Sequence, residues 1–154
     1  MRPWTDIRTP LDIYLRHLGL FLLPLGTWLI LETWRTLVLR GPVRFAILVG
    51  TVSLCGAVGA LAGVPVAAVA LPVGILAFGL ALVDGLESEA EGLRRGSAPR
   101  ALLWLWVAAA MALTLGVEVL VLEGDIGRMN TVFKFHFQAW TLLAVSAAVA
   151  VTYL

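Results

Sequence analysis

The sequence predicts an all-α fold, a polytopic transmembrane helical bundle of about five spanning helices. Hydrophobic residues make up 60% of the 154 positions, and only 14% of the residues are charged. A soluble domain carries roughly 25% charged residues, so this chain lacks the polar side chains to cover a surface in water. The mean hydropathy is +0.95, and the apolar runs are too long, and alternate too little, for strands. The solvent of this protein is therefore predicted to be lipid.

Five stretches approach the roughly 20 apolar residues that a spanning helix needs. We expect a single transmembrane region with helices at residues 11–31, 45–62, 66–83, 101–122 and 131–154. In the first helix, Asp12 and Arg16 stand four residues apart and can pair on one face. His17 lies beside them near the helix end, which is more typical of an interfacial hydrogen-bonding residue than of a ligand.

The second and third helices are predicted to form a tight hairpin. Only Gly63-Val64-Pro65 separates them. A glycine after one helix followed by a proline before the next is the sequence pattern expected for a tight turn between helices. Gly59 and Gly63 stand four residues apart, as do Gly56 and Ala60, so helix backbones can approach closely there. We interpret this spacing as packing within the bundle in preference to a dimerisation motif.

The basic residues favour one orientation in the cell membrane by the positive-inside rule, in which acidic residues carry little weight. If five helices alternate, one side holds these arginines: Arg35, Arg40, Arg44, Arg94, Arg95 and Arg100. The other side holds fewer basic residues, some of them near helix ends: Arg2, Arg8, Arg16, Arg128 and Lys134. This modest bias predicts an extracytoplasmic amino terminus and an extracytoplasmic loop at residues 123–130. The charged loop at 84–100 is predicted to lie in the cytoplasm. There it is either simply solvated or, as the alternative, binds a partner.

Residues 116–140 concentrate polar chemistry in an otherwise apolar protein. The polar and ionisable residues of this segment are Glu118, Glu123, Asp125, Arg128, Asn130, Lys134, His136 and Gln138. Within the fifth predicted helix, Thr131, Lys134, Gln138 and Thr141 follow one another at spacings that put them on one face. A polar stripe on a spanning helix is expected to face protein or a water-filled cavity, so the cluster favours a cavity mouth.

Glu118 strengthens that interpretation, because it lies inside the fourth predicted helix, one turn after Thr114. A carboxylate inside the membrane has a high free-energy cost and usually has a functional role. The alternative is structural. Lys134 then extends to the lipid head groups, Asp125 pairs with Arg128, and Gln138 joins a hydrogen bond between helices.

Several function classes lack their signals in this sequence. The net charge of +1 and the scattered arginines do not indicate nucleic-acid binding. No histidine and cysteine cluster has the spacing of a zinc site, no glycine-rich loop precedes a lysine to cradle phosphates, and no nucleophile elbow is present. These absences argue against cytosolic nucleotide chemistry.

The run Arg128-Met129-Asn130-Thr131-Val132-Phe133-Lys134-Phe135, followed by Gln138-Ala139-Trp140, resembles a family hallmark. It is similar to that of the YYY membrane-protein family of archaea and green non-sulphur-type bacteria, large polytopic proteins of unknown function. The segment Thr9-Pro10-Leu11, leading into Tyr14-Leu15 and Gly19-Leu20-Phe21, resembles a second family element. His136 stands where the family pattern leads us to expect an aromatic residue, often tyrosine, so we assign it no family role.

The resemblance implies a distant similarity to GT-C glycosyltransferases, which use polyprenyl-phosphate sugars at the outer membrane face. It also implies that the chain is an internal fragment of a longer protein, whose acidic catalytic residue lies in a first external loop outside this sequence. The implied partners are the lipid bilayer, a polyprenyl-phosphate sugar and the remaining helices of the full-length protein, with no nucleic acid.

Two functions are compatible with these observations. In a lipid-linked glycosyltransferase, Asp125 or Glu118 would bind a divalent metal or polarise an acceptor hydroxyl. Arg128 and Lys134 would hold the donor phosphate, while Asn130 and Gln138 would orient the sugar. The alternative is a non-enzymatic component, either a transporter segment or an assembly scaffold, since the sequence shows no pair of broken helices and no duplicated half.

Overall fold

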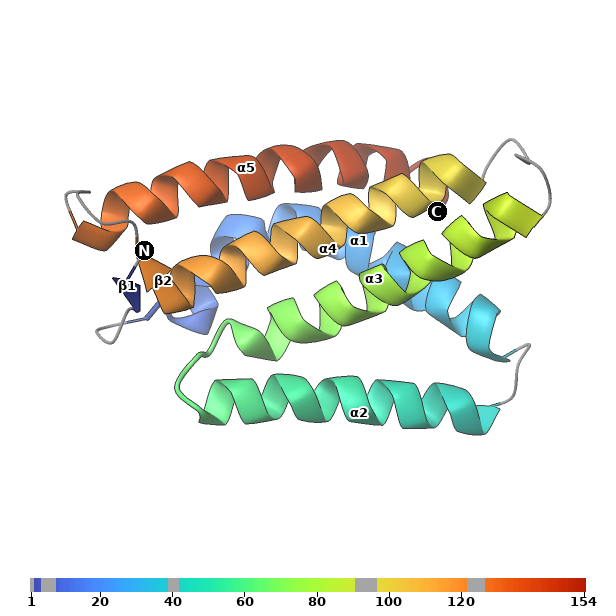
Figure 1. Ribbon diagram of the computed structural model, residues 1–154, viewed down its shortest axis with the longest axis horizontal. Coiled ribbons are helices and arrows are strands. Elements are labelled where there is room, and N and C mark those ends of the chain that lie inside the picture. The colour runs from blue at the N-terminus through green and yellow to red at the C-terminus, as the bar shows by residue number, and fades with distance from the viewer. Residues whose placement is uncertain (1, 4–7, 39–41, 91–96, 122–126) are drawn as a thin grey trace.

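The computed structural model describes residues 2–3, 8–38, 42–90, 97–121 and 127–154, apart from some side chains at the edges of these ranges. Five helices confirm the predicted all-α bundle (Figure 1). They are α1 (Leu11–Val38), α2 (Pro42–Leu61), α3 (Ala67–Ala90), α4 (Ser97–Val119) and α5 (Gly127–Ala150). Two short strands, β1 (Arg2–Pro3) and β2 (Leu120–Val121), pair antiparallel. The sequence analysis did not anticipate this pairing, which brings the amino-terminal segment to the end of α4.

Several helices extend beyond the limits that hydropathy suggested. α1 continues to Val38 where residue 31 was expected, and α3 continues to Ala90 where residue 83 was expected. Helical hydrogen bonds persist where a chain leaves the hydrocarbon, whereas hydropathy marks only the apolar portion of each helix. α4 begins at Ser97 with Pro99 in its first turn, a position that tolerates proline because its amide has no partner within the helix.

Four helices of the described residues are long and apolar enough to cross a membrane. Their candidate spans are Leu11–Thr36, Ala67–Leu86, Ala98–Val119 and Met129–Ala150. α2 contributes a shorter apolar helix, Leu48–Leu61, within the part of the chain that the structure describes. The prediction of about five spanning helices therefore corresponds to four full-length candidates and one shorter helix.

α2 and α3 form the predicted tight hairpin. Gly63 has a φ of +84°, a left-handed conformation that glycine adopts without steric cost. The Val64 amide donates to the Gly59 carbonyl at 3.1 Å, which satisfies a carbonyl at the end of α2. A Cβ built on Gly59 would lie 2.6 Å from the Cβ of Ala67 on α3. The small residues therefore allow close packing inside one chain, as predicted.

α3 and α4 form the centre of the bundle, and α2 and α5 lie on opposite sides of this pair (Figure 1). α1 contacts α2, α3 and α5. Deep in the bundle, the fully buried Trp28 of α1 stacks on Trp104 of α4 with ring centroids 3.9 Å apart. Tyr153 stacks on the same Trp28 ring at 4.9 Å. These aromatic contacts bury large apolar areas and fix α1 against its neighbours.

Candidate functional site

The start of α1, the α2–α3 turn, the end of α4 and the start of α5 lie at the same end of the bundle (Figure 1). The segment before α1 joins these elements. The Arg8 guanidinium donates from Nη1 to the Gly63 carbonyl in the hairpin turn at 2.8 Å. Thr9, the next residue, contacts the end of α4 through Glu118. Of the residues that the sequence singled out, Glu118 and Asn130 lie at this end of the described structure.

Glu118 is almost fully buried, with 1% of its surface exposed. The Thr9 backbone amide donates to its Oε2 at 3.0 Å, and the Thr9 hydroxyl donates to its Oε1 at 2.6 Å. The second distance is at the short end of the range for a hydroxyl that donates to a carboxyl oxygen. The amino terminus of α1 carries a partial positive charge, which further favours a carboxylate beside it. Glu118 thus links the start of α1 to the end of α4.

A second polar contact between the same helices lies one turn deeper. The Tyr14 hydroxyl lies 3.1 Å from Oγ1 of Thr114, and Thr114 itself donates to the Met111 carbonyl at 2.9 Å. Because the single Thr114 proton is used for Met111, Tyr14 is the donor in the first contact. Tyr14 and Thr114 are both buried. The α1–α4 interface therefore contains two sets of polar contacts about one helical turn apart, one at Glu118 and one at Thr114.

The predicted site residues of the last helix have different environments. Asn130 is half-buried, whereas Lys134 and Gln138 are exposed on the surface of α5. Asp125 lies outside the described residues, and of Arg128 only the backbone, within α5, is described. The structure brings Glu118 together with Thr9, and it puts Lys134 and Gln138 on an outward surface of α5.

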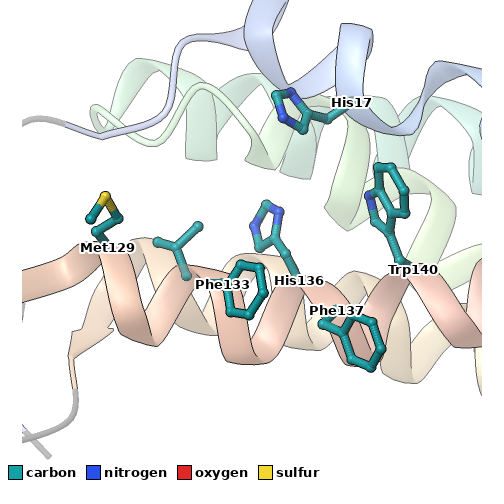
Figure 2. Close-up of a pocket in the computed structure, with 7 residues that line it drawn as sticks. His17, Met129, Phe133, His136, Phe137 and Trp140 are labelled. Carbon is teal, nitrogen blue, oxygen red and sulfur yellow. The ribbon is translucent and has the colours of Figure 1, made fainter. Parts of the chain in front are cut away.

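An apolar groove of about 480 Å³ lies between α1 and α5. Its lining residues are His17, Met129, Val132, Phe133, His136, Phe137 and Trp140 (Figure 2). Beside the groove, Phe21 of α1 meets Trp140 of α5 edge to face, with ring centroids 5.5 Å apart. The volume is in the range of small-molecule sites, which are typically lined by aromatic side chains with a few polar groups.

Two imidazoles and the Trp140 indole provide polar groups in the described lining of this groove. Figure 2 shows the rings of His17 and His136 in the space between α1 and α5. Nδ1 of His17 lies 3.1 Å from the carbonyl oxygen of Ile13, one turn earlier. A carbonyl can only accept, so Nδ1 carries the proton and Nε2 is the nitrogen available to other groups. His136 is half-buried, and its Nε2 atom is buried.

The sequence analysis missed this pairing of histidines. His17 was predicted to be an interfacial hydrogen-bonding residue. It does bond Ile13, while its position at the membrane interface stays a prediction, and His136 was given no role. The two residues are far apart in the sequence, and their common groove depends on how α1 packs against α5. The Asp12–Arg16 pair, by contrast, was predicted from spacing alone and is present at 3.6 Å.

The described residues contain no group of three or more histidine, cysteine or acidic side chains that could hold a metal ion. Glu123 and Asp125, the other acidic residues of the polar segment, lie outside those residues. Glu118 supplies one carboxylate, already bonded to Thr9.

Comparison with known proteins gives one family. A family model with the description "uncharacterized membrane protein (DUF2298)" matches residues 3–143. No match was found among curated proteins or among solved structures. The matched range includes both the Thr9–Glu118 contact and the groove.

Proposed function

Because the chain belongs to the family of uncharacterized membrane proteins DUF2298, we propose that this multi-pass membrane protein is part of a lipid-linked glycosyltransferase. In this proposal the family shares ancestry with the YYY proteins and with GT-C enzymes. The donor is a polyprenyl-phosphate sugar, and the reaction takes place at the outer face of the cell membrane. The residues before and after α5 then lie on the extracytoplasmic and cytoplasmic sides respectively.

The observation that carries the proposal is the aromatic groove between α1 and α5. An isoprenoid chain is apolar and branched, so it fits a groove whose walls are mainly aromatic and aliphatic. The residues proposed for the polar part of the donor belong to the same stretch of α5 as the groove lining: Arg128, Asn130, Lys134 and Gln138. In this proposal, a lipid lying in the groove carries its phosphate and sugar to this stretch of the helix.

The proposed chemical roles follow from the residue types. Asp125 would bind a divalent metal or polarise the acceptor hydroxyl. Glu118 could do so only after exchanging its hydrogen bonds with Thr9, so we favour Asp125 for this role. Arg128 and Lys134 would hold the donor phosphate as cationic hydrogen-bond donors, and Asn130 and Gln138 would orient the sugar.

The test is a transfer assay in the full-length membrane protein with polyprenyl-phosphate sugars as donors. Asp125→Asn should lower kcat strongly, because it removes a charge needed in the reaction. Lys134→Ala should mainly raise KM for the donor, because it removes a phosphate contact. Thr27→Val provides a control on the exposed surface of α1, where the hydroxyl bonds only its own helix at Leu23. Wild-type transfer by both site variants would overturn these roles.

One observation favours the competing function, a non-enzymatic transporter segment or assembly scaffold. Glu118, the most buried ionisable residue in the described part of the segment, bonds Thr9 and so serves the packing of α1 on α4. If Glu118→Gln lowers stability and no transfer occurs with any polyprenyl-phosphate sugar, even in wild-type full-length protein, the scaffold or transporter segment is the better description.

A further inference from the structure

We propose that His17 and His136 form a phosphate-binding pair, which selects a single-chain isoprenoid lipid carrying a terminal phosphate for the α1–α5 groove. This inference rests on the proposed function for the identity of the lipid and adds the residues that recognise its phosphate. Among the residues that the structure describes, the lining of the groove includes two imidazoles and no carboxylate, so an anionic group that enters the groove meets no repulsion from these side chains.

The orientation of His17 is fixed by its own helix. Since Nδ1 donates to the Ile13 carbonyl, the ring presents Nε2 to other partners. A neutral Nε2 accepts a hydrogen bond from the P–OH of a monoanionic phosphate. A protonated Nε2 donates to a phosphate oxygen and adds charge attraction. His17 can therefore bond a phosphate group in either protonation state.

His136 and Trp140 provide a second set of polar groups from the opposite wall. Figure 2 shows the His136 ring pointing from α5 toward α1, and the Trp140 indole with its nitrogen on the edge that faces the groove. The contact between Trp140 and Phe21 holds this indole in place. Groups from two helices thus surround the same space, and a phosphate between them could be contacted from both sides.

The depth of the pair agrees with a lipid phosphate. Arg16 and Asp12 form an exposed ion pair, with 81% and 62% of their side chains accessible. Charged side chains are costly in hydrocarbon, so this pair marks the head-group level of α1. His17 follows Arg16 directly, and His136 shares the groove with His17. The imidazoles therefore lie where a membrane lipid carries its phosphate, and the aromatic lining is available for the chain.

The lining is mainly aromatic and aliphatic around the two imidazoles, so it fits an apolar chain that carries a phosphate, as the isoprenoid donor of the proposed function does. A bilayer phospholipid, with two acyl chains on one phosphate, is the competing lipid. Another helix of a longer protein would bring its own backbone and side chains and would not need the imidazoles. Both alternatives are outcomes of the experiment below.

The experiment measures binding to the full chain in phospholipid nanodiscs, using native mass spectrometry. The probes are farnesyl phosphate and farnesol, which differ only in the phosphate. We expect wild-type protein to bind farnesyl phosphate at least about tenfold more tightly than farnesol, the ratio typical of one charge-assisted hydrogen bond or more. His17→Phe with His136→Phe should reduce this ratio to about one and leave farnesol binding unchanged.

Matched variants separate phosphate recognition from packing. His17→Gln and His136→Gln keep a nitrogen donor near the Nε2 position and should retain part of the preference, which also covers the case in which the double phenylalanine variant fails to fold. Phe133→Ala removes an apolar wall and should weaken both probes by the same factor. An equal affinity of wild-type protein for both probes, or an unchanged ratio in the histidine variants, would overturn the inference. The inference would also be overturned if wild-type protein bound neither farnesyl phosphate nor farnesol, because phospholipid or another helix would then be the occupant of the groove.

Glycosyl transfer is measured separately on the same variants. If phosphate preference depends on the histidines while no transfer occurs with any polyprenyl-phosphate sugar, the lipid-phosphate site stands and the proposed enzyme does not. If transfer occurs and the histidine variants keep both the phosphate preference and the wild-type KM, the enzyme stands and the histidine pair does not.

Discussion

The two ends of α4 anchor neighbouring helices through carboxylates in different ways. At one end, Asp84 of α3 accepts a hydrogen bond from the Arg100 guanidinium at 3.0 Å, as part of an ion pair. At the other end, Glu118 accepts hydrogen bonds from the uncharged backbone and hydroxyl of Thr9. Each carboxylate lies close to the start of another helix, where the helix dipole favours negative charge.

The cavities at the two ends differ as well. Near the Asp84 end, a cavity of about 330 Å³ between α1, α2 and α3 is lined by two threonines, a glycine and apolar residues. The groove nearer the Glu118 end is lined by two histidines and several aromatic residues. Buried carboxylates therefore occur at both ends, where they serve helix packing, whereas of these two cavities only the groove has ionisable side chains among its described lining residues. The groove is therefore the better candidate for a functional site. Variants that disrupt the contacts of the two carboxylates test how much they contribute to helix packing.

The largest effect is expected for Glu118→Ala. The substitution leaves the Thr9 amide and hydroxyl without their acceptor and should lower the free energy of unfolding by about 3 kcal/mol, since hydrogen bonds to charged groups contribute roughly 1.5–3 kcal/mol each. Unfolding of the protein in mixed micelles by SDS titration measures it. Thr9→Val should cost less, because the backbone amide still bonds Glu118. A loss smaller than that of Thr9→Val would show that Glu118 does not hold α1.

The next largest effect is expected at the opposite end. Arg100→Met should lower the free energy of unfolding by about 2 kcal/mol, because it removes the ion pair and hydrogen bond that Arg100 makes with the mostly buried Asp84. The cost should be smaller than for Glu118→Ala, since the Arg100 side chain is 30% exposed and water can replace part of the interaction. The double variant Asp84→Asn with Arg100→Met should recover stability relative to Arg100→Met alone. The same titration measures both, and equal losses at the two ends would remove the contrast between them.

Much of the fold followed from the sequence, because the helices are determined by local patterns. Long apolar runs predicted five helices, and the spacing of Gly56 and Gly59 predicted the close α2–α3 contact. The Asp12–Arg16 pair also followed from local spacing. Each of these features depends on residues within one helix or one hairpin, where hydrophobic period and helical geometry suffice.

The candidate site could be predicted only in part. The sequence indicated that Glu118 is unusual, but its partner Thr9 lies 109 positions away, and no local pattern reveals that contact. Helical spacing put Thr131, Lys134, Gln138 and Thr141 on one face that was expected to meet protein or a cavity, but Thr131 is buried whereas Lys134 and Gln138 are exposed. Whether a helical residue is covered depends on the neighbouring helices. The groove could not be predicted for the same reason, since it is formed by the packing of α1 against α5. Tertiary packing therefore decided the site, while local periodicity decided the helices.

A smaller effect is expected in the hairpin beside the Glu118 end. Gly59→Ala places a methyl group against Ala67, so α2 and α3 must separate slightly. We expect a net loss of about 1 kcal/mol in the free energy of unfolding, because overpacking costs roughly 1–3 kcal/mol and is partly offset by the better helix propensity of alanine. Gly50→Ala is the matched control on the same helix, with nothing within 4 Å of the new methyl group. It should be neutral or slightly stabilising, and a loss as large as that of Gly59→Ala would mean that packing against α3 is not the cause.

The smallest effect is expected for the exposed Asp12–Arg16 pair. Asp12→Asn with Arg16→Gln should change the free energy of unfolding by no more than about 0.5 kcal/mol, because an exposed pair within one helix turn is screened by water and salt. The measurement is the same SDS titration at low and high ionic strength, and the difference from wild-type protein should shrink as salt is added. A large, salt-independent loss would show that Arg16 and Asp12 are buried against lipid or another helix. It would also remove the argument that α1 reaches the head-group level at His17, and with it the depth assigned to the groove.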